Sequence, residues 1–325
     1  MRVAIVGCGV MGQTHAASAA QAGFTVSLCA DPVLAKAEEL AKPYGAKATD
    51  NVTAACGSAD VDVVAIATPT PFHVDLVRAA AAAGKNIFCE KPLGRDLDQC
   101  NAILSAVKSA GVKLFVGHVV RYFPEYEAMR TNVQNKSLGK AGFVRMFRGG
   151  ICPQGQGGWF RAWEQSGGVT LDCAIHDFDW LRYVFGDVAR VYSQDLRDHF
   201  GEGMDYNMTT VRMKNGVIAQ VTGSWAHPSG FCTKVEICAE NGMIVHNSNE
   251  APIAMQKRVA EVGSVNAVVP GSPTSVSPYT LEWMDFLQWL EGKGNPRVTP
   301  EDAVEAVRIC LAALESAEKG EPVSL

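Results

Sequence analysis

Three closely spaced glycines near the start of the chain have the spacing of a phosphate-binding turn. Gly7, Gly9 and Gly12, with Val10 and Met11 between the last two, fit the pattern GxGxxG. They follow a short apolar run and precede a helical segment, which is the context that gives this pattern its meaning. Glycines there permit a tight turn, and the helix N-terminus offers N–H groups to a pyrophosphate. The five residues therefore predict a dinucleotide site, with a glycine-rich turn that binds nothing as the alternative.

An acidic residue further along indicates which dinucleotide would bind. Asp31 ends the second apolar run, and no basic residue follows before Lys36. A carboxylate at this position accepts hydrogen bonds from the adenosine ribose and repels a 2′-phosphate, which favours NAD over NADP. Asp31, followed by Pro32, could instead cap the next helix, and the two roles are compatible.

A lysine follows another apolar run, in the sequence Glu90-Lys91-Pro92. Ligands of open parallel sheets bind beyond the carboxyl ends of the strands, so Lys91 is expected to face a cleft. An ordinary surface lysine is the alternative when Lys91 is considered alone.

Two carboxylates and an imidazole are spaced to share one face of a helix predicted over residues 169–184. Asp172, His176 and Asp179 stand at positions i, i+4 and i+7, apart from the apolar residues of the same segment. Such a face is typical of a site wall. Individually, the three could be a cap, a core histidine and a surface acid. An Asp/His/Asp metal site is a further alternative, and we predict no metal.

The first part of the chain alternates short apolar strands with amphipathic helices. This alternation predicts a parallel sheet with helices on both faces, a Rossmann domain over residues 1–120. The expected strands are 3–6, 26–30, 63–67, 86–89 and 113–117, and the expected helices are 11–22, 73–83 and 97–110.

The pattern changes to strand-like runs after about residue 120. Asn215-Gly216 and Asn241-Gly242 separate such runs and are strong hairpin signals. A mostly antiparallel open sheet is therefore predicted in an α+β domain over residues 121–325. The predicted fold class of the whole chain, a Rossmann domain followed by this domain, is α/β. Its expected strands are 143–148, 189–194, 208–213, 217–225, 233–239 and 243–246, its other helices are 125–135, 281–291 and 300–319, and a loop is expected over 252–278.

The composition of the 325 residues excludes several classes of protein. The net charge of −5 and the lack of a basic block argue against nucleic-acid and anionic-membrane partners. No apolar run reaches the roughly 20 residues of a membrane span. The ten cysteines form no CxxC pair and mostly lie in apolar runs, which indicates buried thiols in a reducing compartment. We expect a soluble cytoplasmic protein.

Taken together, these segments resemble the glucose–fructose oxidoreductase / inositol dehydrogenase / rhizopine catabolism (Gfo/Idh/MocA) family over almost the whole chain. The motifs that carry the resemblance are the glycine turn, Thr68-Pro69-Thr70-Pro71-Phe72-His73, Cys89-Glu90-Lys91-Pro92-Leu93, Val116-Gly117-His118 with Arg121 and Tyr122, Trp159-Phe160-Arg161, and the segment from Ser166 to Asp179.

The resemblance implies a role for each matching position. Lys91 would contact both the nicotinamide and the reacting hydroxyl, and His176 would be the acid/base. Asp172 would support the substrate and the catalytic group. The cofactor would also be lined by Thr68, Pro69, His73 and Glu90. Arg121, Trp159, Arg161 and Asp179 are further candidates for substrate binding.

The implied activity is NAD-dependent hydride transfer from a secondary alcohol of a sugar or an inositol-like polyol. Histidine, with an ordinary pKa near ~6.5, suits proton transfer at neutral pH, and a lysine ammonium can stabilise a developing alkoxide. Two alternatives remain: transient use of NAD for glycoside cleavage or elimination, and a regulator that binds the dinucleotide without catalysis. The family also implies a homodimer or homotetramer formed through the open face of the second sheet.

Overall fold

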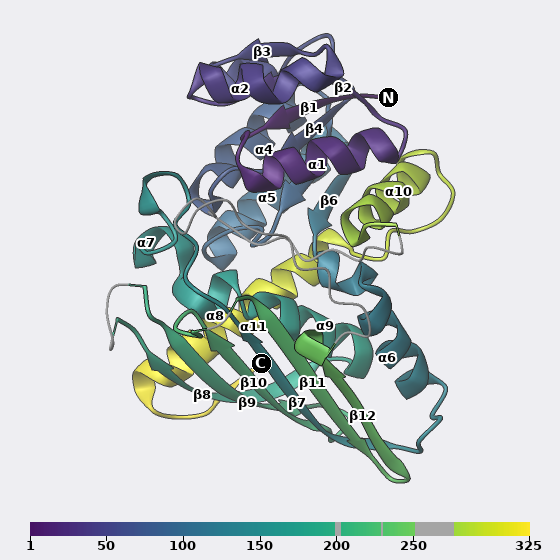
Figure 1. Ribbon diagram of the computed structural model, residues 1–325, viewed down its shortest axis with the longest axis vertical. Coiled ribbons are helices and arrows are strands. Elements are labelled where there is room, and N and C mark those ends of the chain that lie inside the picture. The colour runs from purple at the N-terminus through teal and green to yellow at the C-terminus, as the bar shows by residue number, and fades with distance from the viewer. Residues whose placement is uncertain (199–202, 229, 251–275) are drawn as a thin grey trace. The chain divides into compact units, whose positions relative to one another are not determined.

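The structure, a computed structural model, describes residues 1–198, 203–228, 230–250 and 276–325 (Figure 1). The chain forms two compact units, which are considered separately. The first comprises Met1–Tyr122 and Thr274–Val304, and the second comprises Phe123–Pro273 and Glu305–Leu325. The predicted boundary between the domains, at residue 120, lies close to the observed division. The prediction did not assign the later segment, Thr274–Val304, to the first unit.

The sheet of the first unit has six parallel strands in the order β3-β2-β1-β4-β5-β6. The strands are β1 (Arg2–Val6), β2 (Thr25–Ala30), β3 (Lys47–Thr49), β4 (Val63–Ile66), β5 (Asn86–Glu90) and β6 (Leu114–Gly117). This order reverses direction between β1 and β4, and that switch point is where sheets of this kind bind ligands. The predicted Rossmann architecture is confirmed.

Most helices of the first unit begin and end close to their predicted bounds. They are α1 (Val10–Gln21), α2 (Leu34–Ala41), α3 (Val52–Cys56), α4 (His73–Ala82), α5 (Leu97–Ala110) and α10 (Pro278–Leu290), with short 3₁₀ turns at Lys42–Tyr44, Thr70–Phe72 and Val119–Tyr122. The side chain of Asp96 accepts a hydrogen bond from the amide of Gln99, which caps the start of α5. The short elements β3 and α3 had no predicted counterpart, and α2 was expected only as the helix after Asp31, without bounds.

An aromatic cluster explains why α10 belongs to the first unit. The indole of Trp283 stacks on Phe88 of β5 with ring centroids 4.5 Å apart, and Phe24 meets the same indole at 5.0 Å. Phe286, one helical turn later, lies 5.3 Å from Phe115 of β6. Burying these rings against the sheet gives α10 a large apolar contact.

The second unit is built on a seven-stranded sheet in the order β12-β11-β7-β10-β9-β8-β13. Its strands are β7 (Ala141–Gly149), β8 (Val188–Leu196), β9 (Tyr206–Met213), β10 (Ile218–Ser224), β11 (Cys232–Ala239), β12 (Gly242–Asn247) and β13 (Val323–Ser324). Among the described strands of this sheet, only β7 and β10 pair in parallel. The mostly antiparallel sheet and both Asn-Gly hairpins are confirmed.

Helices cover one face of this sheet. They are α6 (Pro124–Gln134), α7 (Trp163–Ser166), α8 (Gly168–Asp172), α9 (Ile175–Phe185) and α11 (Pro300–Lys319), with 3₁₀ turns at Gln156–Gly158 and Ser248–Glu250. A Cβ at Gly223 of β10 would lie 3.2 Å from Val169, so α8 packs closely on the sheet. Side chains of β9 alternate between buried and exposed, which leaves the other face open.

None of the helices in the described part of the chain is long and apolar enough to cross a membrane. Residues 251–275, which include most of the predicted loop over 252–278, lie outside the described residues. The last residue of that predicted loop, Pro278, begins α10 instead.

Candidate active site

The three glycines of the predicted turn differ in what surrounds them, and each fits a dinucleotide. Gly7 has a φ of +92°, and a Cβ there would lie 2.6 Å from the carbonyl oxygen of Ala67. A Cβ at Gly12 would overlap the carbonyl oxygen of Gly7, so α1 can approach the turn only without one. Apart from the adjoining backbone, no atom of the described residues lies within 4 Å of a Cβ at Gly9. That open space before α1, where Val10 and Met11 begin the helix, suits a pyrophosphate.

Asp31 connects the end of β2 to the glycine turn. Its Oδ2 accepts the backbone N–H of Cys8 at 2.9 Å, and its Oδ1 accepts that of Val33 at 2.9 Å. The bond to Val33 closes a local turn before α2, while Val33 itself is the N-cap residue, so Asp31 is not the helix cap that the alternative predicted. Each carboxylate oxygen keeps a second lone pair for a ligand hydroxyl.

We expect Asp31→Ala to narrow the preference for NAD over NADP. The substitution removes the charge that repels a 2′-phosphate, and it also removes the two backbone bonds. Because lost backbone bonds weaken both dinucleotides, the ratio of the two dissociation constants is the informative quantity. If wild type binds NADP as tightly as NAD, or if the ratio is unchanged in the variant, the role of Asp31 is wrong.

His73 holds together the two loops that follow β4 and β5. Its Nε2 lies 3.0 Å from the carbonyl oxygen of Thr68, and its Nδ1 lies 2.9 Å from that of Pro92. The ring is fully buried, and burial lowers its pKa although both carbonyls oppose this. These contacts give the imidazole a structural function; a contact with the cofactor stays a prediction.

The loop after β4 also presents a polar atom suited to a ligand. The hydroxyl oxygen of Thr68 is buried and has no hydrogen-bond partner among the described residues. Such a group normally has one, so a polar ligand atom beside Thr68 and Pro69 would satisfy it. The residues of the first unit therefore fit a dinucleotide, held by the glycine turn, Asp31 and this loop.

Lys91 follows β5 directly, and Glu90 fixes its backbone. Glu90 Oε2 accepts the N–H of Lys91 at 3.0 Å, and Glu90 Oε1 lies 2.6 Å from Nε2 of His15 in α1. Sequence reasoning missed His15. Its position three residues after Gly12, on a helix that begins at the dinucleotide turn, was the available signal.

Arg121 is buried among structural contacts of the first unit. Its guanidinium donates to the carbonyl oxygen of Arg297 at 2.7 Å and to Asp302 at 3.0 Å. Arg297 in turn donates to the carbonyl oxygen of Arg121 at 2.8 Å. These bonds connect the 3₁₀ turn after β6 to the start of α11. A substrate contact for Arg121 stays a prediction without support from these bonds.

The single helix predicted over 169–184 is wrong in one respect, because it divides at Cys173. The amide of Ala174 bonds to the carbonyl of Val169, five residues back, so a wide turn separates α8 from α9. Asp172 therefore ends α8 and His176 is the second residue of α9. Asp172 and Asp179 are buried and His176 is half-buried. The regular i, i+4, i+7 spacing thus holds only between His176 and Asp179.

Two predicted substrate residues of the second unit meet around a thiol that the sequence did not indicate. Burial raises the pKa of Cys152 to about 12; Arg161 opposes the shift, and Asp205 and Asp172 add to it. Arg161 and Asp172 are therefore both close enough to act on one buried sulfur. The ring of Trp159 lies 4.0 Å from that of Phe160, which packs on the same cluster. Arg161 and Asp172 thus lie near one thiol, and Trp159 contacts a residue that packs on the same cluster.

An ion pair beneath α9 anchors the helix that carries His176. Arg148 of β7 donates to both carboxylate oxygens of Asp177, at 2.7 and 3.1 Å, and both residues are buried. Burial raises the pKa of Asp177, and the guanidinium counteracts the shift. Since Asp177 follows His176 directly, the pair fixes the first turn of α9 against the sheet.

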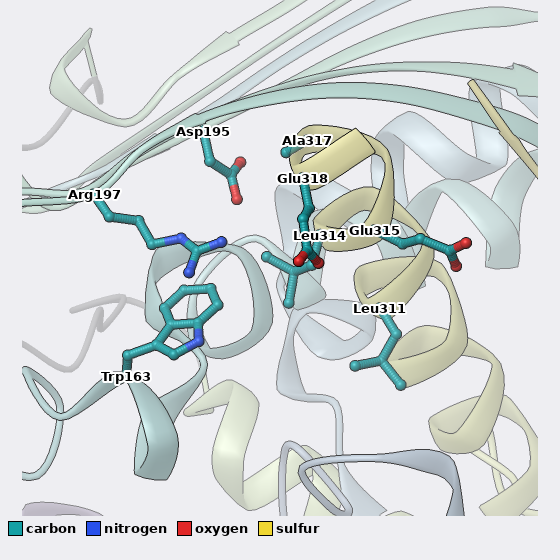
Figure 2. Close-up of a pocket in the computed structure, with 8 residues that line it drawn as sticks. All are labelled: Trp163, Asp195, Arg197, Leu311, Leu314, Glu315, Ala317 and Glu318. Carbon is teal, nitrogen blue, oxygen red and sulfur yellow. The ribbon is translucent and has the colours of Figure 1, made fainter. Parts of the chain in front are cut away.

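A cavity of about 630 Å³ lies elsewhere in the second unit (Figure 2). Trp163 and Arg197 line one side, where the guanidinium lies 3.7 Å from the centre of the indole, and α11 lines the other. No residue predicted to bind cofactor or substrate lines this cavity. Within the described ranges, no three His, Cys, Asp or Glu side chains are grouped to hold a metal ion.

Comparison with known proteins covers nearly the whole chain. A model of the Gfo/Idh/MocA oxidoreductase family, NAD-binding Rossmann fold, matches residues 1–118, and the model of its C-terminal alpha/beta domain matches residues 130–325. An inositol 2-dehydrogenase of Rhizobium meliloti is 30% identical, over 100% of this chain and 99% of its own. A 1,5-anhydro-D-fructose reductase of Ensifer adhaerens is 32% identical, over 86% and 84%.

The fold comparison agrees with the sequence comparison. The crystal structure of a myo-inositol dehydrogenase from Corynebacterium glutamicum superposes with a TM-score of 0.82 at 26% identity, covering 100% of this chain and 98% of that one. The chain therefore belongs to the Gfo/Idh/MocA family of NAD-binding oxidoreductases.

Proposed function

We propose that the protein is an NAD-dependent dehydrogenase that oxidises a secondary ring hydroxyl of an inositol or a closely related cyclic polyol. The observation that carries the proposal is the placement of Lys91. It follows β5, in a loop that His73 ties to the loop after β4, beside the glycine turn. The names of the related proteins supply the substrate class, since they include an inositol 2-dehydrogenase that aligns over the full chain.

Three side chains carry out the steps that NAD does not supply. NAD, when bound, supplies the acceptor for the hydride. The ammonium of Lys91 stabilises negative charge on the substrate oxygen as its proton leaves. His176 accepts that proton as a general base, and Asp172, at the end of the preceding helix, orients the substrate and His176.

An absorbance screen at the NADH band tests the function. Purified protein is mixed with NAD and, separately, with myo-inositol, scyllo-inositol, glucose and glycosides of glucose. We expect NADH to accumulate with at least one cyclic polyol. No glycoside should give faster NADH formation than that polyol does.

The same screen separates the two alternatives. Consumption of a glycoside with release of its aglycone, and without net NADH, would indicate transient redox chemistry instead. NAD binding without turnover of any compound would favour a regulator.

We further propose that a second copy of the chain covers the open face of the sheet. This face exposes several large apolar side chains: Tyr192, Leu196, Met208, Ile218, Met243 and Val245. Exposed apolar patches on soluble proteins commonly mark interfaces. All ten cysteines are free and nine are buried, which supports the proposed cytoplasmic location.

Light scattering at micromolar concentration should show a dimer or tetramer. Met208→Lys combined with Ile218→Lys should shift the protein towards monomer, because buried unpaired charge at an interface is costly. Gln134→Lys, a charge placed on α6, serves as the control. A wild-type monomer of 34.7 kDa would contradict the proposal.

A further inference from the structure

A chain of three hydrogen bonds runs through the first unit to the backbone of Lys91. The indole N–H of Trp283 points at Nδ1 of His15 at 3.1 Å. Nε2 of His15 lies 2.6 Å from Oε1 of Glu90, and Oε2 of Glu90 accepts the N–H of Lys91 at 3.0 Å. The members come from α10, α1 and the end of β5, so tertiary packing brings them together.

The chemistry of the donors fixes where the proton of His15 lies. An indole nitrogen can only donate, so Nδ1 of His15 must be the acceptor. The ring proton is then on Nε2 and is donated to Glu90. Nδ1 carries no proton where the indole N–H points at it. Trp283 therefore selects the one neutral tautomer that can hold the carboxylate.

Packing leaves these groups little freedom to rearrange. His15 is fully buried, and its ring lies 4.8 Å from Phe88, on which Trp283 stacks. On the other side, a Cβ at Gly117 would lie 3.4 Å from the Glu90 carboxyl, so the β6 backbone also confines that group. Polar groups held this tightly keep a single arrangement.

Three contacts favour the charged form of the Glu90 carboxyl. Burial raises its pKa, whereas the hydrogen bond from His15, the charge of Lys91 and the backbone N–H of Lys91 lower it. A charged acceptor binds a backbone N–H more strongly than a neutral one. Glu90 is thus suited to fix the backbone from which the Lys91 side chain starts.

We propose that His15 is a positioning residue that fixes Lys91 through Glu90, with Trp283 setting its tautomer. The proposal rests on the proposed function only in assigning Lys91 to the substrate oxygen. A histidine that merely fills the core would need neither this tautomer nor a donor at Nε2, and the two explanations predict different results.

The first experiment requires neither NAD nor substrate. Imidazole ¹⁵N spectra of the full chain should show His15 as the neutral Nε2–H tautomer, assigned from the resonance that His15→Gln removes. The Lys91 amide should exchange with solvent about tenfold faster in His15→Leu than in wild type, because its acceptor is no longer held. Detection of the Nδ1–H tautomer or the imidazolium, or unchanged exchange, would overturn the proposal.

The second experiment uses matched substitutions. His15→Gln keeps an amide donor near the Nε2 position and should retain both Lys91 protection and most of kcat, whereas His15→Leu should lose about 10- to 100-fold in kcat with KM nearly unchanged. Phe24→Leu alters the same aromatic cluster without touching the hydrogen bonds, so it should lower stability but not the protection of Lys91.

Equal losses in His15→Gln and His15→Leu would show that His15 acts through packing alone. If wild type turns over no polyol, the proposed function fails by itself. The tautomer and exchange measurements would still decide whether His15 positions Lys91.

Discussion

Replacing either Lys91 or His176 by alanine is expected to lower kcat by about 10²- to 10⁴-fold, the usual contribution of a positioned acid or base. In the proposed mechanism, Lys91→Ala removes the cation from the substrate oxygen, and His176→Ala removes the proton acceptor. His176→Ala should still bind NAD, because the dinucleotide site lies in the other unit. Lys91→Ala should bind it somewhat more weakly. Steady-state kinetics and a fluorescence titration with NADH measure both effects.

Residues that act on the same hydroxyl have non-additive effects. The double variant should therefore be little worse than the poorer single variant. His246→Ala, which alters a half-buried histidine on β12, is the matched control and should retain turnover. If the two losses multiply, or if His176→Ala turns over like wild type, Lys91 and His176 do not form one catalytic unit.

Arg148→Met is expected to lower the free energy of unfolding by about 3–5 kcal/mol, the usual cost of breaking a buried ion pair. The variant leaves Asp177 buried without its bidentate partner. Adding Asp177→Leu should recover much of the loss, because an apolar pair needs no charge compensation. Urea denaturation of the single and double variants measures this. A loss below about 1 kcal/mol in Arg148→Met would contradict the anchoring role.

The loss in Arg148→Met should also depend on pH. Burial raises the pKa of Asp177, and without Arg148 to counteract it the folded-state pKa should rise further above the unfolded value. The destabilisation is then fully present above the folded-state pKa and disappears as pH falls through it towards the unfolded value, near ~3.9. Denaturation at about pH 7 and about pH 4.5 should therefore show a smaller deficit at the lower pH.

Local signals in the sequence were sufficient for most of the dinucleotide half of the fold and for the hairpins of the second sheet. The glycine turn, the apolar strands and the Asn-Gly hairpins each depend on neighbouring residues, and the structure contains all of them. The helix α10, which carries Trp283, was predicted as a helix but not as part of the first unit. Its partners Phe24, Phe88 and Phe115 are far away in sequence, and no local pattern encodes that contact.

The candidate site was less predictable for the same reason. The division between Asp172 and His176 arises where α8 packs on Gly223, since the chain turns there to follow the sheet. His15 had a position on α1 that the sequence could show, but its function depends on Trp283 and Glu90, which approach only in the fold. Cys152 likewise gained a charged environment only from tertiary contacts.

Hydride transfer itself can be tested most directly with a deuterated substrate. The cyclic polyol that is turned over in the screen, carrying deuterium on its carbinol carbons, is mixed with the protein and an equal amount of NAD, and the nicotinamide product is analysed by mass spectrometry. The proposed dehydrogenase should yield NADH that carries one deuterium, together with the corresponding ketone. Recovery of unlabelled NADH, or of NAD alone with a rearranged or cleaved polyol, would contradict net hydride transfer from the secondary alcohol.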